Sequence, residues 1–393
     1  MEICSILLPV KRLSGNDLRV STMTQLDRAQ LMGRVKTVVV KVGSNVLSDA
    51  SDRLDRARVG EICAQVDALR KRGLTVVVVS SGAISAGMAE LGMKSRPTEL
   101  PGLQAAAAVG QCHLMVAYDE HFRRFGCRAG QVLLTREDMN DRARYLNTRN
   151  AIDAMLALGA VPVVNENDTI SVAEITFGDN DFLAAMVTNL ISAQLLVLLS
   201  SVEGLETPSG DVLDVVAADD ASVKEFVRRE KTKLGKGGMA SKLEAADIAR
   251  SSGEMVVIAN GRRANVLVDV LDGKKVGTLL LPGGKKLTAR ERWIGFGARP
   301  AGTLVVDDGA RKALVERGKS LLPSGVIEVQ GEFAAGDVVT VAGREGGAIA
   351  RGLANYSSAD ARKIAGRKSV DIASVLGSIP YAEIVHRDHM VVL

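Results

Sequence analysis

Two lysines in distant parts of the chain stand beside glycines, where they could bind a phosphate group. Lys41 lies in the segment 40–44 (VKVGS), at the end of an apolar run, and Lys242 closes the segment 235–242 (GKGGMASK). Glycine lets backbone N–H groups approach an anion closely, and the start of a helix favours negative charge. The two segments predict a phosphate site with cations supplied. A lysine at a strand edge and a flexible surface loop are the alternatives.

Three further segments carry hydroxyl, amide or carboxylate side chains: 80–83 (SSGA), 165–168 (NEND) and 178–181 (GDND). The N–H groups of the first, at the start of a predicted helix, would attract an anion, unless its serine is simply a helix cap. The second segment suits an ammonium or hydroxyl group on a substrate, and the third could cap a helix, orient lysines or reach the waters of a metal ion. A polar turn and plain capping are the alternatives.

Most of these segments follow an apolar, β-branched run, which is typical of a strand buried on both faces of a parallel sheet. Helical periodicity fills the intervals between the runs. The alternation predicts an α/β layered domain whose ligands bind beyond the carboxyl ends of the strands. The predicted strands are 37–42, 74–80, 160–165, 195–200 and 254–260, and the predicted helices are 55–72, 104–125, 141–158 and 239–251.

The pattern changes twice along the chain. Residues 1–33 are expected to be an N-terminal extension, and 34–272 the α/β domain. Glycine, proline, lysine and arginine accumulate in 273–299, which we expect to be a linker. Residues 300–393 are expected to form a small, mostly β domain, with short β-like pieces at 303–306, 325–329, 337–341, 348–353 and 390–393.

Composition argues against several classes of function. A net charge of +4 over 393 residues and an aromatic content of 3% do not indicate nucleic acid as the chief partner. No apolar run reaches the roughly 18 residues that a membrane span needs. The four cysteines form no C-x-x-C pair, so neither a zinc site nor a disulfide framework is indicated. A cytoplasmic protein is expected.

Taken in order, the segments closely resemble the glutamate 5-kinase family of the amino acid kinase superfamily. NEND followed by GDND is the most specific part of the resemblance. It implies a three-layer αβα sandwich with a mainly parallel sheet, followed by a PUA-like domain. The matching segments are 40–44 (VKVGS), 81–84 (SGAI), 107–111 (AAVGQ), 132–138 (VLLTRED), 165–168 (NEND), 178–181 (GDND) and 237–242 (GGMASK).

The resemblance implies a reaction. The γ-phosphoryl group of ATP, with Mg²⁺ bound through ATP, would pass to the side-chain carboxylate of L-glutamate, giving L-glutamyl 5-phosphate in the first step of proline biosynthesis. A carboxylate with a pKa of about 4.3 is already ionised at neutral pH, so no general base is needed. Another superfamily member with a different carboxylate or phosphate acceptor is one alternative. An RNA-binding protein with a degenerate kinase scaffold is the other.

The resemblance also implies residue roles. Lys41 and Lys242 would stabilise the transferring phosphoryl group, Asp181 would orient them, and Asp168 would bind the substrate α-ammonium. Glycine N–H groups, including that of Gly43, would donate to phosphate. The substrate residues are Ser81, Asp168, Asn180 and Asn165, and the ATP residues are Lys41, Gly43, Ser200, Ser201, Lys236, Gly237, Gly238, Met239, Ala240, Ser241 and Lys242.

Two departures from the family pattern fall on the ATP side. The family often has Thr-Asp or Ser-Asp where this chain has Ser200 and Ser201, and threonine where it has Lys236. The resemblance further implies inhibition by proline and a homo-oligomer, either dimer or tetramer. PUA domains in other proteins bind RNA, but from residue 300 onward eleven Lys and Arg balance eleven Asp and Glu. Such a balance lacks the basic footprint that RNA selects.

Overall fold

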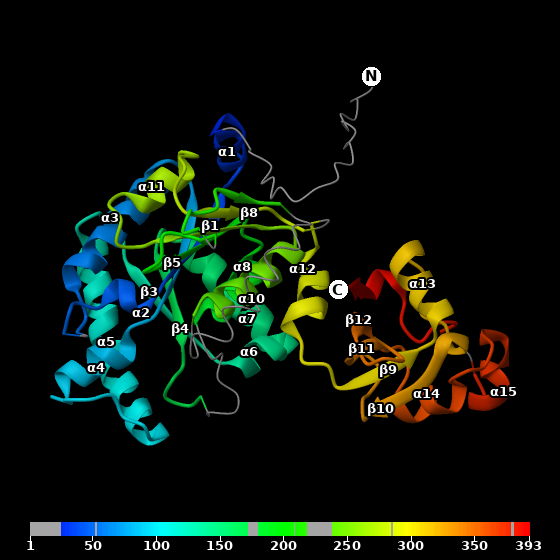
Figure 1. The fold of residues 1–393 in the computed structure, drawn as a ribbon. Coiled ribbons are helices and arrows are strands. Elements are labelled where there is room, and N and C mark those ends of the chain that lie inside the picture. The colour runs from blue at the N-terminus through cyan, green and yellow to red at the C-terminus, as the bar shows by residue number, and fades with distance from the viewer. Residues whose placement is uncertain are drawn as a thin grey trace.

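Two separate β-sheets organise the molecule. The computed structural model describes residues 25–51, 53–171, 180–207, 209–217, 238–283, 286–378 and 381–393. The larger sheet has eight strands in the order β3-β4-β2-β1-β5-β7-β8-β6, and the smaller has five in the order β10-β9-β11-β12-β13. Figure 1 shows the larger sheet between helices, with the C-terminal domain beside it.

The larger sheet is mainly parallel because its strands are joined by helical crossovers. Its parallel strands are β1 (Thr37–Val42), β2 (Thr75–Ser80), β3 (Ala129–Leu134), β4 (Val161–Glu166), β5 (Leu195–Ser200) and β7 (Met255–Asn260). Two short strands finish one edge: β8 (Thr278–Leu280) runs antiparallel to β7, and β6 (Val215–Val216) runs parallel to β8. The strands β4 and β5 are buried along their whole length. The apolar sequence of β5 predicts this, whereas β4 also buries the polar side chains of Asn165 and Glu166.

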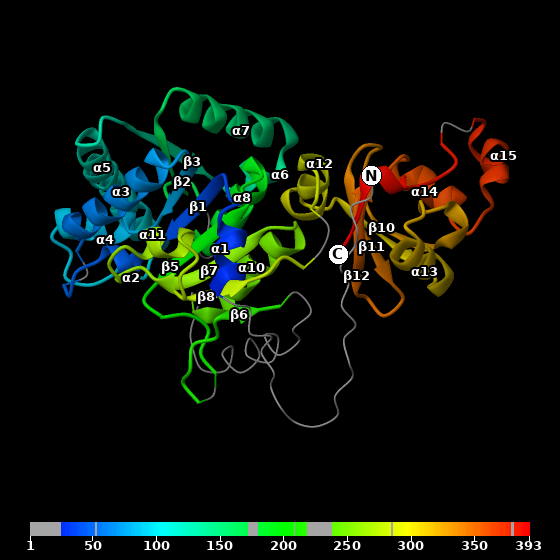
Figure 2. The ribbon, with the colours of Figure 1, turned by 90° about the horizontal axis from the view of Figure 1, so that it is seen from above.

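Two helical layers cover the sheet (Figures 1 and 2). Alternate residues of β1 belong to opposite cores, Val38 and Val40 to one and Val39 to the other. The first core includes α3 (Arg56–Lys71), α5 (Leu100–Arg123) and α11 (Val266–Leu271). The second includes α7 (Arg142–Ala157), α8 (Asn180–Ile191) and α10 (Met239–Ser251). The predicted three-layer sandwich is confirmed.

The same domain also contains shorter helices. They are α1 (Gln25–Met32), α2 (Ser44–Leu47), α4 (Ala83–Glu90) and α6 (Arg136–Asn140). No helix in the described part of the chain is both long and apolar enough to cross a lipid bilayer.

The C-terminal domain contains each of the strands that the sequence predicts. They are β9 (Gly302–Val306), β10 (Val326–Gly331), β11 (Val338–Gly343), β12 (Ala348–Leu353) and β13 (Met390–Val392). It also contains helices that were not predicted, α13 (Asp308–Arg317), α14 (Ser358–Ile364) and α15 (Ile372–Leu376). The helix α13 is marked by its caps, since Asp307 accepts from Ala310 N and Gly318 is left-handed.

Parts of the segment 273–299, which was expected to be a linker, form regular elements instead. The strand β8 belongs to the large sheet, and α12 (Ala289–Arg292) leads into one turn of π-helix, η1 (Trp293–Gly297). Arg292 is buried and forms an ion pair with Glu254, which ties this segment to the first domain. A three-residue strand is too short to show a periodicity, which is why the sequence pattern did not reveal it.

Candidate active site

The polar segments of the sequence meet at one edge of the large sheet. In the sheet order, β4, β2, β1 and β5 are neighbours, and they run parallel. Their carboxyl ends therefore lie side by side and carry Glu166, Ser80, Lys41 and Ser200. Ligands of open α/β sheets bind at this edge.

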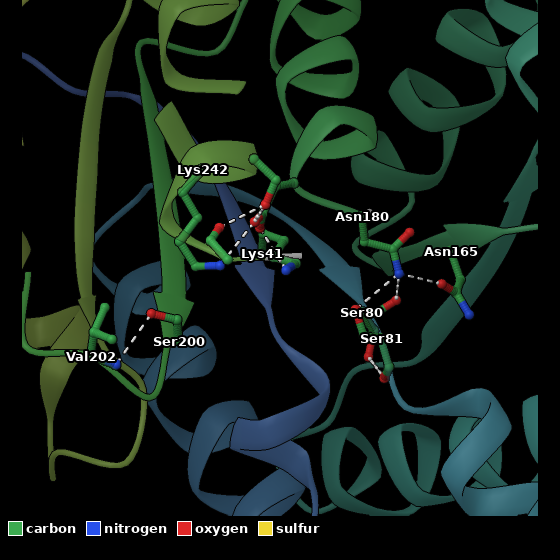
Figure 3. A network of polar contacts seen from close by, with 11 residues as sticks. Lys41, Ser80, Ser81, Asn165, Asn180, Ser200, Val202 and Lys242 are labelled. Atoms are coloured by element: carbon green, nitrogen blue, oxygen red, sulfur yellow. Dashed lines mark hydrogen bonds and ion pairs between the residues drawn. The ribbon is translucent and has the colours of Figure 1, made fainter. Parts of the chain in front are cut away.

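Three side chains from separate elements form a buried ion cluster at this edge (Figure 3). Lys41 comes from β1, Asp181 from the first turn of α8 and Lys242 from the first turn of α10. Lys41 Nζ lies 2.5 Å from Asp181 Oδ1, and Lys242 Nζ lies 3.1 Å from Asp181 Oδ2. The exposed fractions of Lys41, Asp181 and Lys242 are 3%, 0% and 8%. The two lysines, 201 positions apart in the numbering, share one carboxylate.

The charges of this cluster do not cancel. Burial by itself raises the pKa of the Asp181 carboxyl, but the Lys41 and Lys242 ammonium groups and their hydrogen bonds more than offset it and hold that pKa below its usual range. Asp181 is therefore ionised at neutral pH. Two ammonium groups against one carboxylate give these three side chains a net positive charge, and because they are buried this charge acts more strongly on an anion than it would in water.

The start of α10 supplies further donors beside the cluster. Gly238 is its N-cap, and the N–H groups of the first turn, including those of Met239 and Ala240, precede the first intrahelical donor. Ser241 Oγ lies 3.2 Å from Asp181 Oδ2 and 2.9 Å from Gly238 O, and its single hydrogen can donate to either of these acceptors. This end of the helix therefore suits an anion. The expected ATP residues Lys236 and Gly237 lie outside the described residues.

The backbone N–H of Gly43 does not have the role toward phosphate that the resemblance implies. Its N–H donates to Leu199 O at 3.1 Å, within the sheet, and so is not directed at a phosphate group. A Cβ at this position would lie 3.2 Å from Leu199 O and 3.8 Å from Lys41 Nζ. The glycine instead allows β1 and β5 to approach closely and leaves space beside the lysine.

An amide network begins one residue before Asp181 (Figure 3). Asn180 Nδ2 lies 2.9 Å from Ser81 Oγ, 3.1 Å from Ser80 O and 2.9 Å from Asn165 Oδ1, and its two hydrogens are shared among these three acceptors. Three of the four expected substrate residues, Ser81, Asn165 and Asn180, are thus in contact. Because Asn180 and Asp181 are consecutive, the amide network and the ion cluster adjoin.

The fourth expected substrate residue, Asp168, follows β4 and is half-buried. Burial and the nearby Glu166 carboxylate raise the pKa of Asp168 to about 6, while Arg96 acts in the opposite direction. Glu166 itself is 8% exposed. Two carboxylates that repel each other in this way favour a cation near them, since an ammonium group would relieve their repulsion.

Comparison with known proteins identifies the family. The amino acid kinase family model matches residues 36–260, and the PUA domain model matches residues 302–376. A glutamate 5-kinase of Pelobacter propionicus is 44% identical over 372 residues, which cover 93% of this chain and 100% of that protein. One of Chromohalobacter salexigens is 46% identical over 366 residues, covering 92% of this chain and 97% of that protein. The chain belongs to the glutamate 5-kinase family. The resemblance seen in the sequence is confirmed.

The serine pair in which Ser201 departs from the family pattern lies at the end of β5. Ser200 is 8% exposed, and its Oγ accepts from Val202 N at 3.4 Å, while Ser201 is exposed. Ser200 is on the strand next to β1, which carries Lys41. Their role toward a nucleotide in this member of the glutamate 5-kinase family stays a prediction.

One polar residue at this site, Gln111, was not predicted as a substrate or ATP residue. Gln111, in the AAVGQ segment shared with the glutamate 5-kinase family, accepts from Asn165 Nδ2 through Oε1 at 2.9 Å. It lies on α5, where the surrounding sequence is typical of an ordinary buried helix face. A glutamine on an otherwise apolar helix face is the signal that could have pointed to it.

Proposed function

We propose that this protein transfers the γ-phosphoryl group of ATP to the side-chain carboxylate of L-glutamate, forming L-glutamyl 5-phosphate, the first step of proline biosynthesis. The observation that carries the proposal is the buried cluster of Lys41, Asp181 and Lys242 beside the amide network of Asn180. The relatives named glutamate 5-kinase, 44% and 46% identical over almost their whole length, support it.

The chemistry needs positioning and positive charge rather than a base. The acceptor carboxylate is ionised at neutral pH, so its oxygen can attack the γ-phosphorus directly, and the bond to the β-phosphate oxygen breaks as ADP leaves. Lys41 and Lys242 would neutralise the charge on the phosphoryl oxygens as an anion approaches a polyanion. Asp181 would hold both ammonium groups in place, so little reorganisation is needed during transfer.

The nucleotide would lie over the start of α10. The N–H groups of its first turn and the residues Gly238 to Lys242 supply donors to the phosphates. The described residues contain no cluster of three or more His, Cys, Asp or Glu that could hold a metal ion. The Asp181 carboxylate is engaged by two ammonium groups, so phosphate oxygens of ATP are the better ligands for Mg²⁺. The ion would neutralise phosphate charge when bound.

Glutamate would lie between the two parts of the site. Ser81, Asn165 and Asn180 offer hydroxyl and amide groups close to the ion cluster, and Asp168 with Glu166 would receive the α-ammonium. The end of glutamate that is phosphorylated must face the lysines. The amino acid end would then face the segment 165–168.

Coupled ATP turnover with a panel of acceptors tests the proposal. L-glutamate, L-aspartate, N-acetyl-L-glutamate and UMP represent the carboxylate and phosphate acceptors of the superfamily. Glutamate is expected to give the highest kcat/KM, with formation of an acyl phosphate that hydroxylamine traps as a hydroxamate. Turnover confined to aspartate or UMP would refute the proposed acceptor, and salt-dependent RNA binding without turnover would favour the RNA-binding alternative.

Three further properties stay predictions. A dimer or tetramer, inhibition by proline and a cytoplasmic location follow from the family resemblance or the composition. RNA binding by the C-terminal domain, which PUA domains in other proteins show, is not what the composition predicts. The balanced charge of residues 300–393 argues against RNA binding. The free thiols of Cys63, Cys112 and Cys127 are compatible with a reducing compartment.

A further inference from the structure

The side chain of Gln111 has no part in the mechanism above, yet it is unusually placed. It lies on α5 and is 9% exposed. Its Oε1 accepts a hydrogen bond from Asn165 Nδ2 at 2.9 Å. Its Nε2 is buried and has no hydrogen-bond partner among the described residues. A buried donor of this kind destabilises the fold unless a ligand or a water molecule pairs with it.

A backbone carbonyl fixes the direction of every amide in the network. Ser80 O can only accept, and it lies 3.1 Å from the Asn180 amide, so the atom facing it must be Nδ2. This nitrogen also donates to Asn165 Oδ1, which leaves Asn165 Nδ2 to donate to Gln111. Gln111 Oε1 is therefore held toward Asn165, and Nε2 is kept as a free donor.

The same network ends in a free acceptor at its other end. Asn180 Oδ1 is buried and, among the described residues, has no hydrogen-bond partner. The network thus offers a donor at Gln111 and an acceptor at Asn180, both preorganised by the fold. An amino acid, with a carboxylate that accepts and an ammonium group that donates, is complementary to such a pair.

We propose that Gln111 is a specificity residue that donates from Nε2 to the α-carboxylate of the acceptor amino acid, a role that rests on the proposed function. The carboxylate to be phosphorylated must lie at the ion cluster, and Asn180 separates that cluster from Asn165 and Gln111. The α-carboxylate therefore lies at the far end of the site. There the carboxylates of segment 165–168 would attract the α-ammonium but repel the α-carboxylate, so a neutral donor is required.

Gln111→Glu tests this role with little change of shape. The variant keeps an acceptor oxygen for Asn165 Nδ2 and replaces the donor by a carboxylate oxygen. We expect the KM for L-glutamate to rise by about tenfold or more, with kcat and the KM for ATP nearly unchanged, because a charge-assisted hydrogen bond becomes a repulsion.

A second substrate makes the test specific to the α-carboxylate. The α-amide of L-glutamate keeps the γ-carboxylate, and its NH₂ group can donate to the new carboxylate of the variant. The preference for glutamate over this α-amide, as a ratio of kcat/KM values, should fall by about tenfold or more. If neither protein uses the α-amide, a raised glutamate KM at constant kcat supports the proposal by itself.

Gln65→Glu is the matched control. Gln65 lies on α3, is 6% exposed, and accepts from Leu267 N through Oε1 at 2.9 Å. Its replacement makes the same chemical change in an equally buried place and should leave the glutamate KM and the preference unaltered. An unaltered preference in Gln111→Glu, or equal losses with both substrates, would overturn the proposal. Wild-type protein without glutamate-dependent turnover would instead refute the proposed function.

Discussion

The ion cluster depends on the Asp181 carboxylate. It is fully buried, and each of its oxygens lies close to a different lysine. Without the two ammonium groups a carboxylate in this place would be costly, and without the carboxylate the ammonium groups would repel each other. The three side chains therefore stabilise one another and still carry a net positive charge that can act on a phosphate.

Lys242→Ala should reduce kcat by about 10²-fold or more while the glutamate KM changes little. The ammonium group would act on charge that develops during transfer, and removing one such group costs that order of rate. Steady-state kinetics measure both constants. Lys275→Ala is the control, because Lys275 is 65% exposed and pairs with Asp214. An unchanged kcat in Lys242→Ala would remove this lysine from the transfer step.

Asp168→Asn should stabilise the folded protein and raise the KM for glutamate. Burial and Glu166 raise the pKa of Asp168 to about 6 in the folded protein, above about 3.9 in the unfolded chain. The folded state binds more protons, so stability falls as pH rises from about 4 to 6. At pH 7.5 the variant should gain about 1–2 kcal/mol, after allowance for solvent screening, and below pH 4 nothing.

The activity of the same variant separates binding from folding. The glutamate KM should rise because the ammonium group loses its charged partner, and the wild-type KM should rise as pH falls below about 6. Urea unfolding at several pH values and steady-state kinetics provide the two measurements. Asp153→Asn, an exposed carboxylate on α7, is the control and should change neither. A destabilised Asp168→Asn variant would contradict the assigned cause of the raised pKa.

Two helices that flank the amide network cross at unusually short range. A Cβ built on Gly87 of α4 would lie 1.7 Å from Ala106 O, and one on Gly110 of α5 would lie 1.8 Å from Ala83 O. Both atoms belong to the backbone, so the clash cannot be relieved by moving a side chain. The close crossing places Gln111, next to Gly110, beside the segment that ends β2.

Gly110→Ala should therefore destabilise the protein by about 3 kcal/mol or more, although the same change in an open helix is stabilising. The helices would have to separate, so the glutamate KM should rise as well. Thermal unfolding and steady-state kinetics measure the two effects. Gly347→Ala is the control, since nothing lies within 4 Å of a Cβ there. Equal stabilities for the two variants would show that the helices can part at no cost.

The elements that sequence predicted best are those whose pattern is local. The strands 37–42 and 195–200 and the helix 239–251 have the bounds that their apolar runs indicate. The strand β3 was missed because it lies at the edge of the sheet, is only partly buried, and contains Gly130 and Gln131. The same limit applies at the site, since the partner of Gln111 is 54 residues away and no spacing reveals it.

Long-range contacts also explain why the sequence did not predict the direction of the Gly43 N–H group. The segment around Lys41 was correctly placed at a strand end, but the direction of the Gly43 N–H depends on Leu199, on another strand. A glycine pattern indicates that backbone comes close to something. It does not say whether that partner is a ligand or a neighbouring strand.

At the scale of the whole molecule, the second domain meets the first along η1. Ile294 and Ala298 pack against Val338 and Val391 of the C-terminal domain. Arg351 donates to Gly295 O at 2.9 Å. A cleft of about 830 Å³ lies beside this contact and is lined in part by α8 and α10, the helices whose first turns carry Asp181 and Lys242. The segment that joins the domains is thus adjacent to α8 and α10, the two helices that position Asp181 and Lys242.

The ion pair of Glu254 and Arg292 anchors the segment that joins the domains. Removing this ion pair should lower the stability of the whole molecule. Both residues are buried, with exposed fractions of 2% and 1%, and Arg292 Nε also donates to Leu287 O at 2.9 Å. Glu254→Leu should cost about 3–5 kcal/mol, because it leaves a guanidinium buried without its counter-ion. The double change Glu254→Leu with Arg292→Met should recover much of that loss, since it removes both charges. Urea unfolding of the wild type, both single variants and the double variant measures the coupling. Additive losses would mean that the two side chains do not act as a pair.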